Sequence, residues 1–224
     1  MINLEVRRPE LVKNILHQIC GKEAFICGGF ARVVCSPCTA PIPSEDIDIY
    51  LLSKDSFPLL ETRLKELLYI KSKENDVSCV FTYAITSDTL HPPINLIKPI
   101  ENGHLHTFGD IDKILENFDF TIARCGIYLS DGMEIKARGD EDFENNERDH
   151  ILIIKNIHCP IAEVTRISKY MARGYKIPLM QIVRCFLDWE GRDPTYRNEL
   201  VAALEKDKLT DKDKEELYKR LYVD

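Results

Sequence analysis

Two aspartates, Asp46 and Asp48, stand two residues apart in a run of alternating polar and apolar side chains that extends to Leu52. Because the side chains of a strand alternate between its two faces, this run predicts a strand with both carboxylates on one face and Ile47 and Ile49 on the other. Paired carboxylates on a rigid strand can hold divalent cations, which neutralise phosphate charge and lower the pKa of an attacking hydroxyl. The spacing therefore predicts a metal-dependent site for phosphoryl transfer.

A glycine pair, Gly28 and Gly29, separates an apolar run at residues 25–27 from a stretch that is compatible with a helix. Glycine lets backbone N–H groups approach phosphate oxygens closely, and the positive end of a helix favours bound anions. Arg32, one turn into this helix, can add a charge-assisted contact. Taken alone, the glycines also fit a tight turn and the aspartates a sheet edge. Their combination, joined by a proline-containing loop, favours a nucleotide site.

A basic stretch follows Pro160. Arg166, Lys169 and Arg173 lie at positions i, i+3 and i+7, so they share one face of a predicted helix. The chain carries no acidic residue from Arg166 to Arg184. Such a face can hold a triphosphate or an acceptor backbone, although a solvated amphipathic helix has the same pattern. Beside the aspartate pair, the basic face becomes a candidate part of the same site.

Two stretches together resemble a known signature: Gly28-Gly29-Phe30-Ala31-Arg32 and Glu45-Asp46-Ile47-Asp48-Ile49. They resemble the nucleotidyltransferases of the DNA polymerase β-like superfamily. Within that superfamily the chain is most similar to the head and neck of class II CCA-adding enzymes and bacterial poly(A) polymerases. Two further motifs of these enzymes are similar to the stretches Asp119–Ala123 and Arg166–Lys169, the latter followed by Gly174–Ile177.

The chain also departs from the family pattern at named positions. Val33 stands where the family has an aspartate after the arginine. Asn117 and Phe118 stand in place of two arginines, and Ala123 replaces an asparagine. Of the dipeptide Glu-Asp that precedes the neck arginine in the family, only Glu163 is nearby.

The resemblance implies a nucleotidyltransferase that moves a nucleoside monophosphate from an NTP to an acceptor hydroxyl and releases pyrophosphate. Asp46 and Asp48 would bind Mg²⁺, with Mn²⁺ as an alternative, and Asp119 would complete the catalytic and metal-binding set. Asp119 stands between two phenylalanines, and an unpaired buried charge is costly. Its role as a general base or as a metal ligand stays open. The nucleotide-binding residues implied are Gly28, Gly29, Arg32, Arg166 and Lys169.

The acceptor is less closely defined than the chemistry. The resemblance favours an RNA 3′ end, with tRNA as one such acceptor. The net charge of −7 argues against a protein that coats nucleic acid indiscriminately. That charge leaves room for two alternatives, a nucleotidylating toxin or regulator that modifies a protein or small molecule, and a non-catalytic nucleotide-binding module of the same fold.

The composition indicates in which compartment the protein works and whether it binds zinc. No apolar run reaches the length of a membrane span and the N-terminus shows no signal peptide, so a cytoplasmic protein without a membrane partner is expected. Most of the eight cysteines sit in apolar runs, as free thiols do in a reducing compartment. Cys35 and Cys38 form a lone C-x-x-C motif that only His104 and His106 could complete, so no zinc is expected.

The elements that must position these residues follow from periodicity. The fold class expected is α/β with mixed α+β character, a nucleotidyltransferase head with a small mixed sheet followed by an all-helical region. The domains expected are a head at 1–158 and a helical domain at 159–224. Strands are expected at 24–27, 46–52, 77–85, 94–97, 118–128 and 151–154, with a hairpin at Asp131-Gly132. Helices are expected at 9–19, 30–34, 57–68, 110–117, 140–149, 161–174, 178–190, 195–206 and 211–222.

Overall fold

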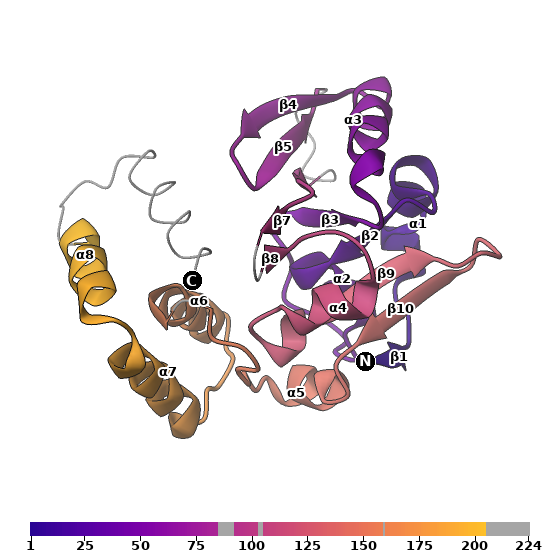
Figure 1. Ribbon diagram of the computed structural model, residues 1–224. Coiled ribbons are helices and arrows are strands. Elements are labelled where there is room, and N and C mark those ends of the chain that lie inside the picture. Colours follow the sequence, from indigo (N-terminus) through magenta and orange to yellow (C-terminus); the bar gives the residue numbers. More distant parts are fainter. Residues whose placement is uncertain (85–91, 103–104, 159, 205–224) are drawn as a thin grey trace.

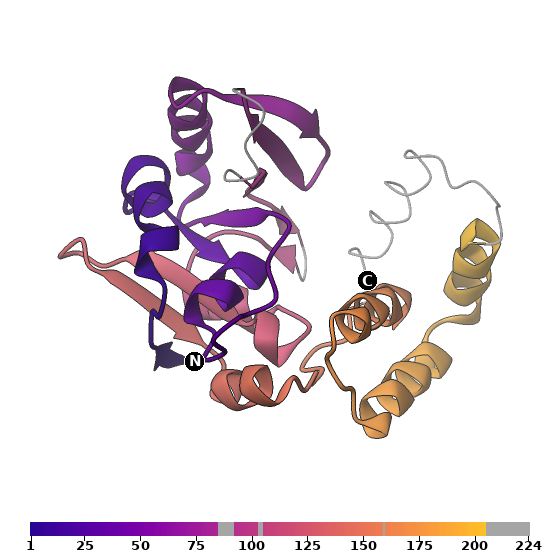
Figure 2. The ribbon, with the colours of Figure 1, turned by 180° about the vertical axis from the view of Figure 1, so that it is seen from behind.

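A mixed sheet of eight strands forms the centre of residues 1–139 (Figures 1 and 2). The computed structural model describes residues 1–84, 92–102, 105–158 and 160–204. Neighbouring strands are antiparallel except β3 and β6, which run parallel. In order across the sheet, the strands are β1 (Ile2–Leu4), β10 (Ile135–Gly139), β9 (Cys125–Leu129), β2 (Ala24–Cys27), β3 (Ile47–Leu51), β6 (Ile94–Ile97), β5 (Ser78–Tyr83) and β4 (Tyr69–Glu74), with β7 (Glu101–Asn102) and β8 (Leu105–His106) as a separate pair.

The helices occur in two groups along the chain. Those of the first group alternate with the strands, and those of the second follow the last strand. The helix expected at 9–19 is present but irregular, because 3-10 and π turns flank a short α-helical segment. The helices are α1 (Lys13–Ile15), α2 (Gly28–Cys35), α3 (Phe57–Glu66), α4 (Ile111–Glu116), α5 (Phe143–Asp149), α6 (Pro160–Ala172), α7 (Leu179–Gly191) and α8 (Pro194–Leu204).

The two faces of β2 and β3 belong to different cores. Ile26 and Ile49 are fully buried in the core that α2 and α3 cover. Phe25 and Tyr50 lie on the opposite face, in the smaller core that α4 covers. Asp48 is half-buried on that second face, while the isoleucines of β3 are buried on the first. The alternation predicted for this strand is confirmed, and it turns the aspartates toward the α4 side.

The segment 118–124 is not the strand that the sequence predicted. The strand begins only at Cys125, and a 3-10 turn at Thr121–Ala123 precedes it. The guanidinium of the buried Arg124 donates hydrogen bonds to the carbonyl oxygens of Phe118, at 2.9 Å, and Glu116, at 2.7 Å. These bonds hold the segment in a turn, so the apolar alternation here reflects burial of a loop. Asp119 therefore lies in a turn and not on a strand.

The last part of the described chain is helical from Pro160 to Leu204, as predicted. A second core joins these helices to the head, with Phe120 and Ile154 on one side and Ile167 and Cys185 on the other.

The residues expected as a strand at 151–154 form only isolated bridges. Strands β1, β4, β7 and β8 were not predicted, and the helix predicted at 211–222 lies outside the described residues. The division into two domains stays a prediction. Within the described ranges, no helix combines the length and the apolarity needed to cross a membrane.

A buried ion pair and its hydrogen bonds connect α2, α5 and the segment that follows α6. Arg32 on α2 donates to Glu147 on α5 at 2.9 Å, and each side chain is 1% exposed. Arg32 also donates to the hydroxyl of Tyr175, which follows α6, at 3.1 Å. Ser36 donates to the same Glu147 carboxylate at 2.9 Å. The helix α5, expected to be solvated, therefore carries a fully buried charge on its inner face.

Replacing Glu147 by alanine should destabilise the protein by about 3–5 kcal/mol, because the change leaves the Arg32 guanidinium buried without its carboxylate. The matched control is Glu144→Ala on the same helix, whose partly exposed ion pair with Arg7 contributes about 0–1 kcal/mol. Urea unfolding followed by circular dichroism measures both. Equal losses in the two variants would contradict the importance of the buried pair.

Candidate active site

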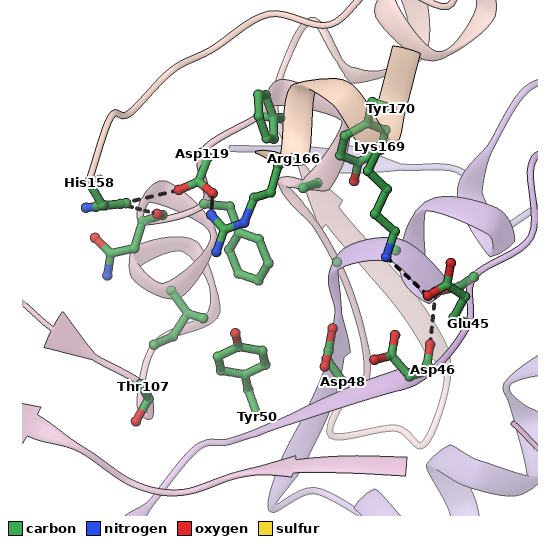
Figure 3. Close-up of a pocket in the computed structure, with 18 of the residues that line it drawn as sticks. Glu45, Asp46, Asp48, Tyr50, Thr107, Asp119, His158, Arg166, Lys169 and Tyr170 are labelled. Carbon is green, nitrogen blue, oxygen red and sulfur yellow. Dashed lines mark hydrogen bonds and ion pairs between the residues drawn. The ribbon is translucent and has the colours of Figure 1, made fainter. Parts of the chain in front are cut away.

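A cavity of about 410 Å³ lies between the N-terminal end of β3, the start of α2 and the basic face of α6 (Figure 3). The cavity therefore brings together stretches that are more than a hundred residues apart in the sequence. Of the residues predicted for the site, all except Arg32 line it, namely Gly28, Gly29, Asp46, Asp48, Asp119, Arg166 and Lys169.

The aspartate pair forms an acidic edge of this cavity. Asp46 is exposed, and Asp48 is half-buried beside the sheet. The amide of Asn95 on β6 donates a hydrogen bond to Asp48 at 2.8 Å. Burial, together with the charge of Asp46, raises the pKa of Asp48 to about 7. A carboxylate with too little positive charge around it has the chemistry of a divalent-cation ligand, so the pair fits Mg²⁺ or Mn²⁺.

At the start of α2, Gly28 is favoured by its backbone conformation and Gly29 by a close contact. Gly28 has a φ of +71°, and a Cβ there would lie 3.4 Å from both Asp48 and the ring of Phe118. A Cβ on Gly29 would lie 2.7 Å from the hydroxyl oxygen of Ser44. The first N–H groups of a helix have no partners within the helix. The glycines thus leave the positive end of α2 open to an anion in the cavity.

Asp119 lies on the opposite side of the cavity from the aspartate pair (Figure 3). Its carboxylate forms an ion pair with Arg166 on α6, and the His158 ring lies 3.8 Å away. Its backbone carbonyl accepts a hydrogen bond from the Lys155 N–H at 2.7 Å. Within the described residues, no group of three His, Cys, Asp or Glu side chains is placed to hold a metal ion. The structure therefore does not gather Asp119 with Asp46 and Asp48 as a ready-made metal site.

Arg32 is the predicted site residue that the structure places elsewhere. Its side chain is buried behind α2, where Glu147, Tyr175 and the backbone carbonyl of Ile42 accept its hydrogen bonds. The Ile42 carbonyl belongs to the loop that leads into the aspartate strand. Arg32 thus supports the geometry of the site and does not line the cavity.

The basic face of α6 forms the wall across from the aspartate pair. Lys169 lies 3.2 Å from the Glu45 carboxylate, and Arg173, just past the end of α6, pairs with the same carboxylate. These ion pairs lower the pKa of Glu45 below its usual range, with the Lys169 hydrogen bond as the largest cause. Helical spacing identified the shared basic face, but nothing in the sequence indicated that Glu45 would bind it.

Several other residues that line the cavity or contact its lining had no signal in the sequence. Asn95 reaches Asp48 because β6 pairs with β3 in parallel, a contact between strands that are distant in the chain. Tyr50 and Phe118 form an aromatic wall, with ring centroids 5.8 Å apart. His158 lies at the cavity rim and contacts the backbone carbonyl of Asn117 at 2.7 Å.

Replacing Asp48 by asparagine should stabilise the metal-free protein at pH 8 by about 1–3 kcal/mol. The folded-state pKa of Asp48 lies above its value in the unfolded chain, so the unfolded chain loses this proton first and the group destabilises the fold increasingly as the pH rises from about 4 to 7. Thermal melts in EDTA at pH 8 and pH 5 measure the effect, which should shrink at pH 5. A variant that is less stable at pH 8 would contradict this charge balance.

Comparisons with known proteins give the fold. No model of a known protein family matches the chain, and no curated protein sequence matches it. Among solved structures, the chain is similar to the Thermotoga maritima CCA-adding enzyme complexed with tRNA, with a TM-score of 0.55 and 16% sequence identity over 98% of this chain and 52% of that one. It is also similar to a CCA-adding enzyme in complex with ATP, with a TM-score of 0.58 and 17% identity over 100% of this chain and 56% of that one.

An apo form of a CCA-adding enzyme gives the same result, with a TM-score of 0.58 and 17% identity over 99% of this chain. The chain spans about half the length of the solved structures that it matches. At these identities the likeness establishes the fold. This chain therefore has the fold that these CCA-adding enzymes show over about half of their length, as the resemblance of its motifs predicted.

Proposed function

We propose that the protein is a metal-dependent nucleotidyltransferase, which transfers a nucleoside monophosphate from an NTP to an acceptor hydroxyl and releases pyrophosphate. The observation that carries the proposal is the pairing of Asp46 and Asp48 beside the glycine turn, across one cavity from a basic helix. A metal, a triphosphate and a hydroxyl each find chemically suitable groups in this cavity.

Asp46 and Asp48 are the residues that would hold Mg²⁺ or Mn²⁺. Bound there, the divalent cation supplies charge neutralisation at the phosphates and lowers the pKa of the attacking hydroxyl. Asn95 orients the Asp48 carboxylate by its hydrogen bond at 2.8 Å. The N–H groups at Gly28 and Gly29 bind phosphate oxygens, and Lys169 adds positive charge from the opposite wall.

Asp119 and Arg166 act at the far end of the cavity. Because they pair with each other, Arg166 fixes the orientation of the Asp119 carboxylate. Asp119 is then available either as a base toward the acceptor hydroxyl or as a further metal ligand once the site is loaded. Arg166 also faces the cavity and can contact the nucleotide itself.

An RNA 3′ end, such as that of tRNA, is the acceptor that we favour. The support is the similarity of fold: nearly the whole of this chain matches part of a CCA-adding enzyme that was solved in complex with tRNA. The basic face of α6 beside the cavity suits an acceptor backbone. The described cysteines are free thiols, which fits activity in the reducing cytoplasm.

Incubation with Mg²⁺, each α-labelled NTP and total tRNA should transfer label to RNA. The double variant Asp46→Asn/Asp48→Asn should lower that transfer on the order of 100-fold or more, because it removes the carboxylates that hold the metal. The control is Asp131→Asn, in the exposed hairpin turn after β9, which should transfer label like the wild type. Equal labelling by wild type and double variant would overturn the catalytic assignment. Label on protein in a lysate, in place of RNA, would redirect the acceptor to a protein hydroxyl.

A further inference from the structure

One exposed carboxylate, that of Glu45, binds two cations of the cavity wall at once. Lys169 lies 3.2 Å from one of its oxygens, and Arg173 pairs with the other. The Glu45 side chain is 69% exposed and directly precedes the aspartate pair in the chain. Figure 3 shows the Lys169 ammonium directed at Glu45, close to Asp46 and Asp48.

The two cations lie where a metal-bound triphosphate would need positive charge. Both pair with Glu45, the residue that directly precedes Asp46, and both line the cavity together with Asp46 and Asp48. Lys169 and Arg173 therefore lie beside the metal-binding edge of the cavity.

The third cationic side chain of the cavity lining, that of Arg166, forms an ion pair away from the aspartate pair. In the lining that the structure describes, the Arg and Lys residues are Arg166, Lys169 and Arg173. Arg166 is paired with Asp119 at the far side. Asn117 and Phe118, which line the cavity too, bring no charge to it. Lys169 and Arg173, the two cations that Glu45 binds, are therefore the lining Lys and Arg side chains on the aspartate side of the cavity.

We propose that Glu45 is an internal stand-in for the triphosphate, which holds Lys169 and Arg173 in position and is displaced from them when a nucleotide binds. The exchange is feasible because the ion pairs of Glu45 are exposed and hence weak. A triphosphate carries several negative charges and can outcompete a single carboxylate for both cations. Arg173 becomes a phosphate-binding residue, and Glu45 sets the affinity. This inference rests on the proposed function, because it assumes that the cavity takes a triphosphate.

Isothermal titration with inorganic tripolyphosphate and Mg²⁺ at low ionic strength tests the exchange. Glu45→Gln keeps the shape of the side chain and removes the competing charge, so it should bind tripolyphosphate about 3- to 10-fold more tightly than the wild type. The matched control is Glu66→Gln, an exposed residue on α3 that does not line the cavity and should bind like the wild type. Unchanged or weaker binding by Glu45→Gln would overturn the inference.

A double-mutant cycle separates competition from general repulsion. If Glu45 acts by occupying the two cations, the gain from Glu45→Gln should be smaller in a Lys169→Gln background and in an Arg173→Gln background than in the wild type. An equal gain in all three backgrounds would overturn the exchange, since it would show that Glu45 merely repels anions.

The proposed function is scored separately, by transfer of label from NTP to acceptor. If the wild type transfers label but Glu45→Gln binds tripolyphosphate no more tightly than the wild type, this inference alone is overturned. A wild type that binds neither tripolyphosphate nor ATP with Mg²⁺ overturns both.

Discussion

The buried ion pair between Arg32 and Glu147 is the constraint on which the geometry of the site depends. It joins α2, whose first residues line the cavity, to α5 at 2.9 Å. Through Tyr175 it also fixes the segment that follows the basic helix α6. A third contact, to the carbonyl of Ile42, ties in the loop that leads to the aspartate strand. A charge buried this deeply requires all of its partners, so these segments are held in one arrangement.

That constraint explains what sequence reasoning could and could not reach. The alternation of β3, the glycine turn and the basic face of α6 are local patterns with a fixed repeat, and each is present as predicted. The partner of Arg32 lies 115 residues away in the chain, so no local pattern indicates that this arginine is a structural one. Asn95 was missed for the same reason, because its contact with Asp48 depends on the pairing of β6 with β3. The turn at Asp119 was missed because buried loops and strands show similar apolar alternation.

The two walls of the cavity have opposite electrostatic states in the absence of a ligand. On the aspartate edge, burial and then the charge of Asp46 raise the pKa of Asp48, as expected for a partly buried carboxylate beside a like charge. On the α6 wall, each cation is balanced by a carboxylate of the cavity itself, either Asp119 or Glu45. In the function that we propose, the metal of a bound triphosphate would meet the aspartates, and its phosphates would replace a carboxylate on the helix. Under this proposal the cavity matches the complex of nucleotide and metal better than either component alone.

The aromatic ring of Phe118 explains the weight that the proposed function gives to the α6 wall. Phe118 packs beside Tyr50, and its ring would lie 3.4 Å from a Cβ on Gly28, so it fills the space next to the glycine turn. An apolar ring there cannot bind a phosphate, whereas the arginines that the family pattern has at this point could. In the function that we propose, the side-chain charge for phosphate binding then comes from across the cavity. The proposal then assigns more of the triphosphate's binding energy to Lys169 and Arg173, and Glu45, which pairs with both, is the residue best placed to control that energy.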